Sequence, residues 1–400
     1  MKDSSSDPST LLHDFTAQQH ANVFLRAFSF PTTHLPRYPE DELELADRVV
    51  LMDNIGFIFL LKEREQKVAT KPGDLEKWVV NNVVKKGAKE VQNTRDLLDD
   101  YMGLSLVNHF GHRVSVTPAE GDDLISVIIY RVPARSRPFR AARFKKSRNG
   151  GFVHILRDSE YFEICEHFVT PAELLDYFAF RRDLLINWDP AAAAVSEDAL
   201  IGQYLLEDYS SGPDQKFERA AVSRGGPTAC EFSFVLDSLA GRLAAQDDDF
   251  ADTESYEILT ELGLLGRYEL KALKHELRLG LEAVRANRFE LPLRIASGRT
   301  ACGFLIVPVT REFRHRAIDA LESLARASKH ELDLPRQVGI GMWNSYDLLR
   351  GKRVPKNEFV DIEWIFLEGD NPPNPELDER LASRYPFRMA SEQKLPPIFV

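Results

Sequence analysis

The sequence predicts an α/β protein with more than one domain. Three observations lead to this prediction: a chain of 400 residues, a hydrophobic content of 44% that includes 25 phenylalanines, and β-rich runs that alternate with segments of helical periodicity. A chain of this length can form two or three domains, each with its own core. We therefore expect an N-terminal α/β domain, a helical middle region and a smaller C-terminal α/β unit.

Composition shifts place the boundaries between these parts. A polar N-terminus, a basic proline-rich segment and a glycine pair mark the changes. We expect a disordered leader over 1–10, an α/β domain over 11–132, a basic linker or loop over 133–149, a mostly helical region over 150–290 and an α/β domain over 291–400.

The N-terminal domain is organised around the stretch from Glu42 to Lys62. An acidic cluster leads into an apolar run, an Asp-Asn turn and a second apolar run that ends on Lys62. Two β-rich runs joined by such a turn predict a hairpin, which brings Asp47 near Lys62. Around it we expect a helix over 11–28, a helix over 75–100 and two further strand segments, over 104–116 and 124–132, that form a second hairpin or crossover.

This hairpin resembles the core of the PD-(D/E)XK nuclease superfamily, which has the restriction-endonuclease-like fold. In that pattern an Asp opens the hairpin, and an acidic or amide residue stands two positions before the Lys. Asp47 and Lys62 match, whereas Leu60 stands where the pattern has Glu, Asp or Gln. Since side chains alternate along a strand, Leu60 and Lys62 share a face, so the departure falls inside the expected site.

The resemblance implies a metal-dependent nuclease that hydrolyses nucleic-acid phosphodiesters with Mg²⁺ or Mn²⁺. Carboxylates would hold the hard cation, and a lysine would stabilise charge that develops on the phosphate. The implied catalytic residues are Asp47, Lys62 and Glu44, and the implied metal ligands are Asp47, Glu44 and Asp53. Glu63 is a weaker candidate because it lies on the opposite strand face. An ordinary hairpin with a solvated acidic lead-in explains the same residues.

A basic stretch from Arg131 to Arg148 is the electrostatic candidate for nucleic-acid binding. It holds eight Lys or Arg residues and no acidic residue, in a chain whose net charge is −11. Lys and Arg supply most of the affinity for phosphates, so a nucleic-acid site here would be a local patch. A solvated loop or linker is the alternative. The predicted nucleic-acid-binding residues are Arg135, Arg137, Arg140, Arg143, Lys145 and Lys146, with Gln92 on the preceding helix.

The middle of the chain extends the resemblance. A strand over 152–156, a helix from Ser159 to His167, a helix capped by Thr170 and the segment SEDALIGQYL follow one another. This order is similar to a family of uncharacterised bacterial proteins with a nuclease-like N-terminal region, and it implies a role in bacterial defence. Two alternatives remain: a catalytically degenerate nuclease fold that acts as a nucleic-acid-binding or protein-interaction module, and a structural protein.

Several other classes of function have no support in the sequence. There is no Walker phosphate-binding loop, the glycines at 339 and 341 lack the third glycine of a dinucleotide motif, and the three cysteines lack zinc spacing. No apolar run approaches a membrane span, and the N-terminus lacks an export signal. We therefore expect a cytoplasmic protein without a membrane partner, with a homo-oligomer or a protein partner left open.

Overall fold

The computed structural model describes two compact units, each built on its own sheet. Unit 1 comprises Met1–Thr228 and Asp247–Ala251, and unit 2 comprises Ala229–Gln246 and Asp252–Val400. The mixed α/β class predicted from the sequence is confirmed. The described residues are 15, 22–35, 44–64, 73–100, 103–117, 124–132, 142–147, 151–188, 194–224, 232–244, 253–344, 360–369 and 388–389.

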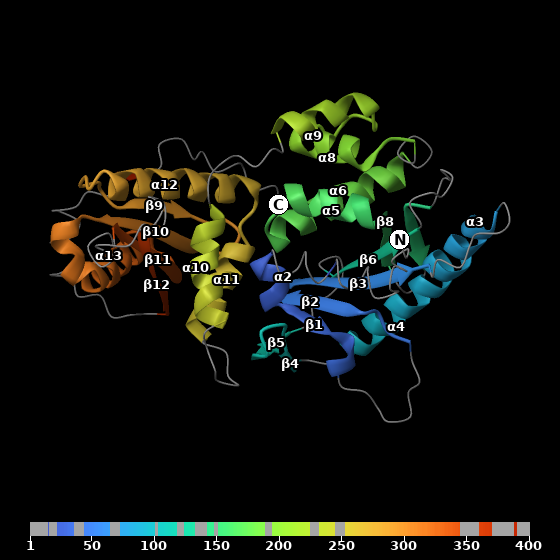
Figure 1. The fold of residues 1–400 in the computed structure, drawn as a ribbon, viewed down its shortest axis with the longest axis horizontal. Helices are drawn as coiled ribbons and strands as arrows, with labels where there is room; N and C mark the ends of the chain where they lie inside the picture. Colours follow the sequence, from blue (N-terminus) through green and yellow to red (C-terminus); the bar gives the residue numbers. More distant parts are fainter. Residues whose placement is uncertain are drawn as a thin grey trace, which may run out of the picture. The chain divides into compact units, whose positions relative to one another are not determined.

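Unit 1 contains a six-stranded sheet with the order β1-β2-β3-β6-β8-β7 (Figure 1). The strand β2 pairs antiparallel with both β1 and β3, while β3, β6 and β8 run parallel, and β7 lies antiparallel to β8 at the edge. The bounds are β1 Ser29–Pro31, β2 Arg48–Met52, β3 Ile55–Glu63, β6 Leu124–Arg131, β7 Phe144–Ser147 and β8 Gly151–Arg157.

The predicted hairpin is formed by β2 and β3. Its turn has Asp53 at a φ of 50°, a left-handed conformation that Asp adopts more readily than most residues. The register pairs Arg48 with Phe59, and Asp47 donates its N–H to the Phe59 carbonyl at 3.0 Å. The start of β2 therefore lies beside the end of β3, as the hairpin pattern predicts.

Helices cover both faces of this sheet. On one face, Phe57 and Phe59 of β3 pack against Phe178 and Tyr161, which belong to α6 and α5. Because alternate side chains of a strand point to opposite faces, Leu60 and Lys62 point to the other face, where α4 packs on β3. The helices of unit 1 are α2 Val23–Ala27, η1 Thr32–His34, α3 Asp74–Trp78, η2 Val79–Lys86, α4 Gly87–Asp99, α5 Asp158–His167, α6 Pro171–Asn187, α8 Glu197–Leu205, η4 Gln215–Phe217 and α9 Glu218–Arg224.

Two expectations about this unit need correction. The segments at 104–116 and 124–132 do not pair with each other: β4 (Leu104–Val107) and β5 (Arg113–Val116) form a separate hairpin, and β6 joins the main sheet beside β3. The expected domain end at residue 132 is also wrong, because β7 and β8 extend the same sheet. The strand β8 pairs with β6 on one side and with β7 on the other.

Unit 2 contains a five-stranded sheet with the order β12-β11-β10-β9-β13. The parallel pair β10 and β11 is connected through α13, and β12 returns antiparallel to β11. The bounds are α10 Phe232–Ala244, α11 Thr253–Gly263, α12 Arg267–Arg285, β9 Leu293–Ala296, β10 Cys302–Val309, η5 Arg311–Arg316, α13 Ala317–Glu331, β11 Arg336–Asn344, β12 Val360–Glu368 and β13 Arg388–Met389.

The two glycines of β11 allow close packing of α13. A Cβ atom at Gly341 would stand 3.1 Å from Leu321 of α13, and one at Gly339 would stand 3.2 Å from the same leucine and 2.7 Å from Ile365 of β12. A larger residue at either position would crowd these neighbours. The helices α10 to α12 belong to unit 2, so the expected helical region over 150–290 is divided between the two sheets. None of the helices that the structure describes is both long and apolar enough to cross a membrane.

Candidate functional site

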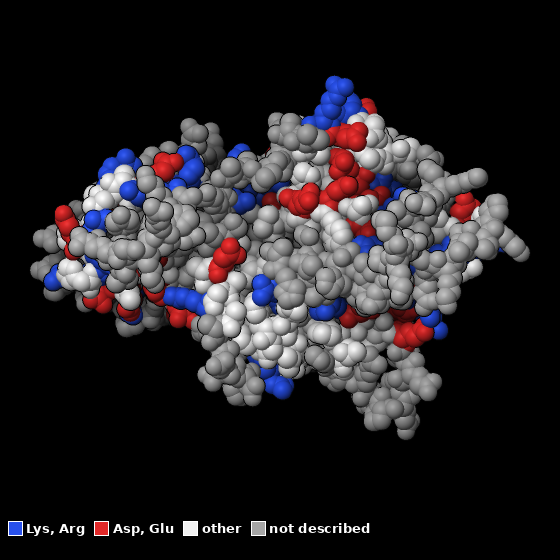
Figure 2. Space-filling view, viewed as in Figure 1, with Lys and Arg blue, Asp and Glu red and all other residues white. Residues whose placement is uncertain are grey.

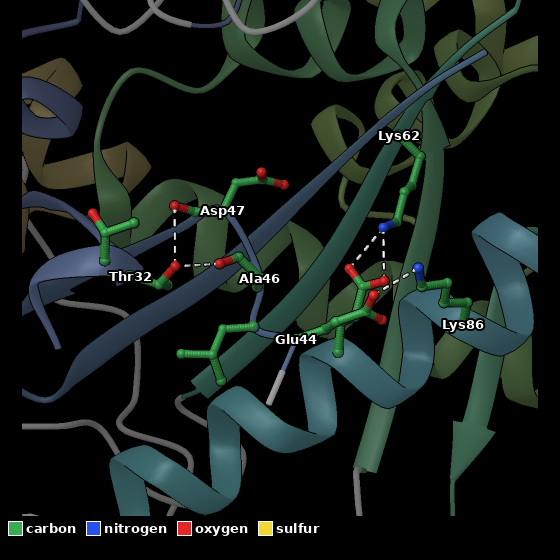
Figure 3. A pocket seen from close by; sticks show the side chains of 9 residues that line it. Thr32, Glu44, Ala46, Asp47, Lys62 and Lys86 are labelled. Carbon is green, nitrogen blue, oxygen red and sulfur yellow. Dashed lines mark hydrogen bonds and ion pairs between the residues drawn. The ribbon is translucent and has the colours of Figure 1, made fainter. Parts of the chain in front are cut away.

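A pocket of about 400 Å³ lies in unit 1 where the end of β3 meets the start of β2 and the helix α4 (Figure 3). Acidic and basic side chains dominate its wall, together with two threonines from η1. This is the region where the sequence places a catalytic site. The lining residues are Thr32, Thr33, Glu44, Leu45, Ala46, Asp47, Lys62, Lys86 and Glu90.

Lys62 is paired with Glu90 inside this pocket. The Lys62 Nζ lies 2.8 Å from Oε1 and 2.7 Å from Oε2 of Glu90, so both carboxylate oxygens accept from one ammonium group. The side chains are 20% and 6% exposed, respectively. A pair this well shielded from water interacts more strongly than a surface ion pair. Glu90 therefore holds the amine in place at the end of β3.

Asp47 reaches the same pocket from the start of β2. Its Oδ2 accepts a hydrogen bond of 2.6 Å from the N–H of Leu61, the residue that precedes Lys62, and this bond anchors the carboxylate. Burial raises the pKa of Asp47 above its ordinary value, and the nearby Glu90 carboxylate adds to the rise. The Leu61 N–H and the Lys62 ammonium oppose it. A bound cation would favour the ionised form of a carboxylate whose pKa is raised in this way.

Leu60, which stands where the nuclease pattern has an acidic or amide residue, is a core residue in this fold. Leu60 is 1% exposed and lies beneath Gly87 at the start of α4, where an added Cβ would stand 3.0 Å from the leucine Cδ2 and from Ile128. A carboxylate at position 60 would thus be buried between the helix and the sheet. Glu90, three residues after Gly87 on the same helix, presents its carboxylate to Lys62 instead.

Sequence reasoning missed Glu90. Its signal is present, because Glu90 lies on the apolar face of the predicted helix with Val83, Gly87, Val91 and Thr94 at helical spacing. A glutamate on a face that is otherwise apolar or small requires a buried partner, and Lys62 is that partner.

Thr94 connects α4 to the segment before β2. Its hydroxyl donates to the Glu90 carbonyl at 3.0 Å and accepts from the Ala46 N–H at 2.8 Å. From the other side, the Thr32 hydroxyl donates to the Ala46 carbonyl, as Figure 3 shows. These bonds fix the backbone that carries Asp47 relative to the helix that carries Glu90.

Glu44 and Lys86 lie at the rim of the pocket. Their ion pair has a length of 2.8 Å, and the side chains are 61% and 48% exposed. Lys86 lowers the pKa of Glu44, mainly through this hydrogen bond. Glu44 therefore reaches the expected site, but as an exposed partner of Lys86 and not beside Asp47 as a buried ligand.

Three other predicted residues do not reach the pocket. Asp53 lies exposed in the hairpin turn before β3, and Lys62 lies near the far end of that strand. Lys62 follows the first residue of β3 by seven positions, so at roughly 3.3 Å per residue Asp53 and Lys62 are more than about 20 Å apart. Gln92 donates to Asp96 at 2.5 Å on α4 and does not line the pocket. Glu63 does not line the pocket either; it lies opposite Arg131 of the neighbouring strand β6. The assignment of Asp53 as a metal ligand is therefore wrong, whereas Gln92 as a nucleic-acid contact stays a prediction.

The predicted basic patch divides into different environments. Arg135, Arg137 and Arg140 lie outside the described residues. Lys145 and Lys146 are exposed on the edge strand β7. Arg143 does not belong to a nucleic-acid surface, because its guanidinium donates to Glu197 and to the Val195 carbonyl.

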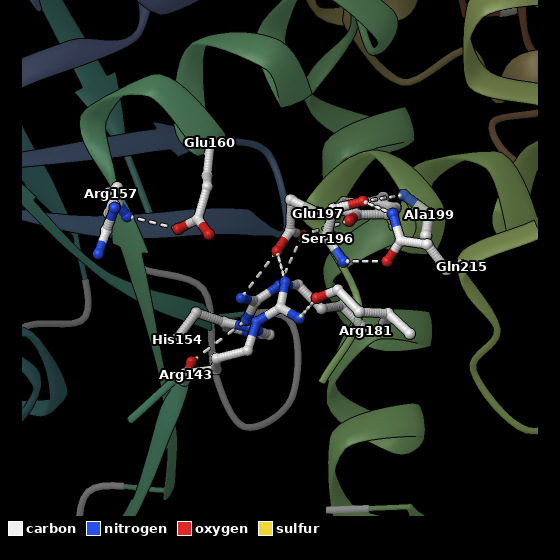
Figure 4. Close-up of polar contacts among 11 residues, drawn as sticks. Arg143, His154, Arg157, Glu160, Arg181, Ser196, Glu197, Ala199 and Gln215 are labelled. Atoms are coloured by element: carbon white, nitrogen blue, oxygen red, sulfur yellow. Dashed lines mark hydrogen bonds and ion pairs between the residues drawn. The ribbon is translucent and has the colours of Figure 1, made fainter. Parts of the chain in front are cut away.

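Arg143 belongs to a buried polar network around Glu197 (Figure 4). Arg181 donates to both oxygens of Glu197, at 2.8 and 3.1 Å, and Tyr177 donates to one of them. Burial alone would raise the pKa of Glu197, but Arg181 and Arg143 outweigh it and hold the pKa at about 2. His154 is 1% exposed with Nδ1 3.0 Å from Arg181, so this histidine is a buried member of the network.

The donors in the pocket fit a hard divalent cation. Asp47 and Glu90 supply carboxylate oxygens, which Mg²⁺ and Mn²⁺ prefer, and Mg²⁺ is commonly held by one or two carboxylates with water and phosphate oxygens completing the shell. Within the described part of the chain, no group of three or more His, Cys, Asp or Glu side chains has the geometry of a metal centre. A cation here would therefore depend on substrate and water for its other ligands.

Comparison with known proteins leaves the site to be interpreted on its geometry alone. No family model matches the chain, and no curated protein or solved structure is significantly similar to it.

Proposed function

We propose that unit 1 hydrolyses nucleic-acid phosphodiesters with the help of a divalent cation, through Asp47, Glu90 and Lys62. The observation that supports this most directly is the placement of the Lys62 ammonium within 2.8 Å of the Glu90 carboxylate, in a pocket that Asp47 also lines. Two carboxylates and a lysine are the groups that the reaction requires. The proposal replaces the missing acid at position 60 with Glu90.

The topology of unit 1 also supports this assignment. An antiparallel hairpin leads through a helix to a strand that lies parallel to the second strand of the hairpin. This arrangement resembles the core of the PD-(D/E)XK nucleases, in which the reactive groups lie at the start of the first hairpin strand and the end of the second. Asp47 and Lys62 occupy those two positions here.

Each residue has a distinct role in the proposed reaction. Asp47 and Glu90 would hold the cation, which would lower the pKa of a water molecule and offset the charge of the phosphate. Lys62 is positioned by Glu90 to stabilise the negative charge that develops on the phosphate oxygens in the transition state. The Leu61 N–H orients Asp47, and Thr94 keeps the helix and the strand in register.

Incubation of the purified protein with plasmid DNA and with RNA tests the proposal. Parallel reactions contain Mg²⁺, Mn²⁺ or EDTA, and we expect cutting with a metal and none with EDTA. Lys62→Ala should abolish cutting, whereas Lys77→Ala, an exposed lysine on α3 that does not line the pocket, should leave it unchanged. Cutting that persists in EDTA or in Lys62→Ala would overturn the proposal.

The second candidate is a nucleic-acid-binding module that lacks catalysis. It is favoured by the neutralisation of Lys62 by Glu90 and by the exposure of Lys145 and Lys146 on an edge strand. In this case, salt-sensitive binding would occur without cutting, and the double variant Lys145→Glu, Lys146→Glu would weaken it.

A further inference from the structure

The outer face of α12 in unit 2 carries a line of positive charge. Lys271, Arg278 and Arg285 are all exposed and are spaced seven residues apart. Since two helical turns take 7.2 residues, this spacing keeps the three side chains on one stripe, about 10 Å apart along the axis. Figure 2 shows Lys and Arg side chains gathered over this helix.

Further exposed cations lie beyond the end of the helix. Arg288 is exposed three residues after Arg285, and the Asn287 side chain accepts from the Arg311 N–H at 2.9 Å, which brings η5 next to the end of α12. Arg311 and Arg316 are exposed on η5. We call the set Lys271, Arg278, Arg285, Arg288, Arg311 and Arg316 the α12 basic surface.

Acidic residues around the α12 basic surface offset part of this charge. Glu269 accepts from the backbone N–H groups of Gly266 and Gly298, and Glu276 is 6% exposed. Glu282 pairs with Arg278 at 3.0 Å and Glu290 pairs with Arg288 at 3.5 Å, and salt screens ion pairs of this kind. Glu312 is exposed on η5 between Arg311 and Arg316. In a chain with a net charge of −11, this concentration of cations is not explained by composition.

Exposed aromatic side chains occur at both ends of the surface. Tyr268 in the first turn of α12 is 55% exposed, and Phe289 and Phe313 at the other end are each 58% exposed. Large exposed aromatics beside arginines provide stacking platforms for unpaired bases, and stacking on them is tolerant of sequence.

The opposite face of α12 is already committed to the core of unit 2. Leu273, Leu277 and Leu281 are buried, and the helix packs on β9, β10 and β11. At Gly280 an added Cβ would stand 2.5 Å from Met342, so the helix lies close against the sheet. Because this apolar face cannot turn toward lipid, insertion of α12 into a membrane is disfavoured. A polyanion that binds to the exposed basic face is favoured instead.

We infer that the α12 basic surface binds the phosphate backbone of a nucleic-acid strand, with the flanking aromatics stacking on its bases. This binding does not depend on hydrolysis in unit 1. Under the proposed function, it would hold the nucleic-acid substrate at a second position on the protein. Its ligand is defined by phosphate charge and unpaired bases and not by a base sequence.

Binding of fluorescent single-stranded and double-stranded oligonucleotides to the full chain in EDTA tests the inference, with Asp47→Asn as background so that no cutting occurs. The triple variant Lys271→Glu, Arg278→Glu, Arg285→Glu should bind at least about tenfold more weakly. Its plot of log affinity against log salt should have a slope smaller by about 2 to 3, because about 0.7 to 0.9 counterions are released for each phosphate contact. Phe289→Ala with Phe313→Ala should weaken binding to single strands more than to duplex.

A matched control keeps the test specific to this surface. Lys216→Glu, Arg219→Glu, Arg326→Glu changes the net charge by the same amount at exposed positions elsewhere and should bind as the parent protein does. Equal weakening in the control, or no weakening in the triple variant, would overturn the inference. Binding to anionic vesicles but not to oligonucleotides would also overturn it.

Two further measurements separate this inference from the proposed function. Hydrolysis of bis(p-nitrophenyl) phosphate, a phosphodiester too small to span two sites, should be lost in Lys62→Ala and retained in the α12 triple variant. If the triple variant does not fold, the corresponding glutamine variants give the same comparison with a milder change of charge.

Discussion

The Lys62 ammonium lies 2.7 Å from the Glu90 carboxylate, although the two residues are 28 positions apart and belong to a strand and a helix. In the proposed function, this contact would supply the acid that the hairpin lacks at position 60. It also makes the candidate site testable, because each member can be altered separately.

Glu90→Gln should abolish metal-dependent hydrolysis. The amide retains one acceptor for Lys62 but loses the charge that would hold a cation, and loss of even a supporting group at a metal site costs about 10- to 100-fold. Cutting rates measured with Mn²⁺ should fall by at least about 100-fold. Glu76→Gln, on the exposed side of α3, is the control and should leave the rate unchanged. A fully active Glu90→Gln would remove Glu90 from the site.

Leu60→Glu should destabilise the protein and should not rescue Glu90→Gln. Leu60 lies beneath Gly87, so a glutamate there would bury a charge without a partner, at a cost of several kcal/mol. Thermal unfolding should show a lower midpoint than Leu60→Met, which conserves volume. If the double variant Leu60→Glu, Glu90→Gln regained activity, the interpretation of the departure at position 60 would be wrong.

Thr94→Val should reduce both stability and activity. The valine leaves the buried Ala46 N–H without its acceptor, and an unsatisfied buried donor costs about 1–3 kcal/mol. Chemical denaturation should show this decrease in the free energy of unfolding, whereas Thr94→Ser should be close to the parent. Because Thr94 does not line the pocket, its effect on hydrolysis acts through the position of Asp47.

Divalent cations should stabilise the folded protein through Asp47. Two carboxylates that share a pocket repel each other, and a bound cation relieves the repulsion, so Mn²⁺ at about 100 times its dissociation constant should add about 3 kcal/mol. Thermal unfolding with and without Mn²⁺ measures this difference. Asp47→Asn should lose the response, whereas Asp53→Asn, in the remote hairpin turn, should keep it.

The stability contributed by Glu197 should disappear in acid. Its pKa is about 2 in the folded protein and 4.5 is its ordinary value, so the unfolded chain takes up the proton first as the pH falls. The folded state therefore has the full contribution above pH 4.5 and loses it as the pH falls through 2. At 1.36 kcal/mol per pKa unit the ionic part is about 3 kcal/mol.

Urea denaturation of the parent and of Glu197→Gln from pH 7 to pH 2 measures this linkage. The difference in free energy of unfolding should shrink by about 3 kcal/mol between pH 4.5 and pH 2. Glu282→Gln, which alters an exposed ion pair, should show no comparable dependence on pH. A difference that stays constant with pH would show that Glu197 acts through packing alone.

The sequence by itself determined the local elements of this protein. Two continuous apolar runs joined by the Asp53 turn were sufficient to predict the hairpin, and therefore the neighbourhood of Asp47 and Lys62. The cap at Thr170 was predicted for the same reason, since it depends on residues within a few positions.

The tertiary structure alone decided which charges meet. Glu90, Lys62 and Leu60 are arranged by the packing of α4 on β3 at Gly87, and a packing contact leaves no fixed spacing in the sequence. Packing likewise places Arg143 inside a buried network, although its neighbours in the sequence are basic and polar. Burial and long-range pairing determine whether a charged residue is a ligand, a surface contact or a structural support, and both are properties of the folded chain.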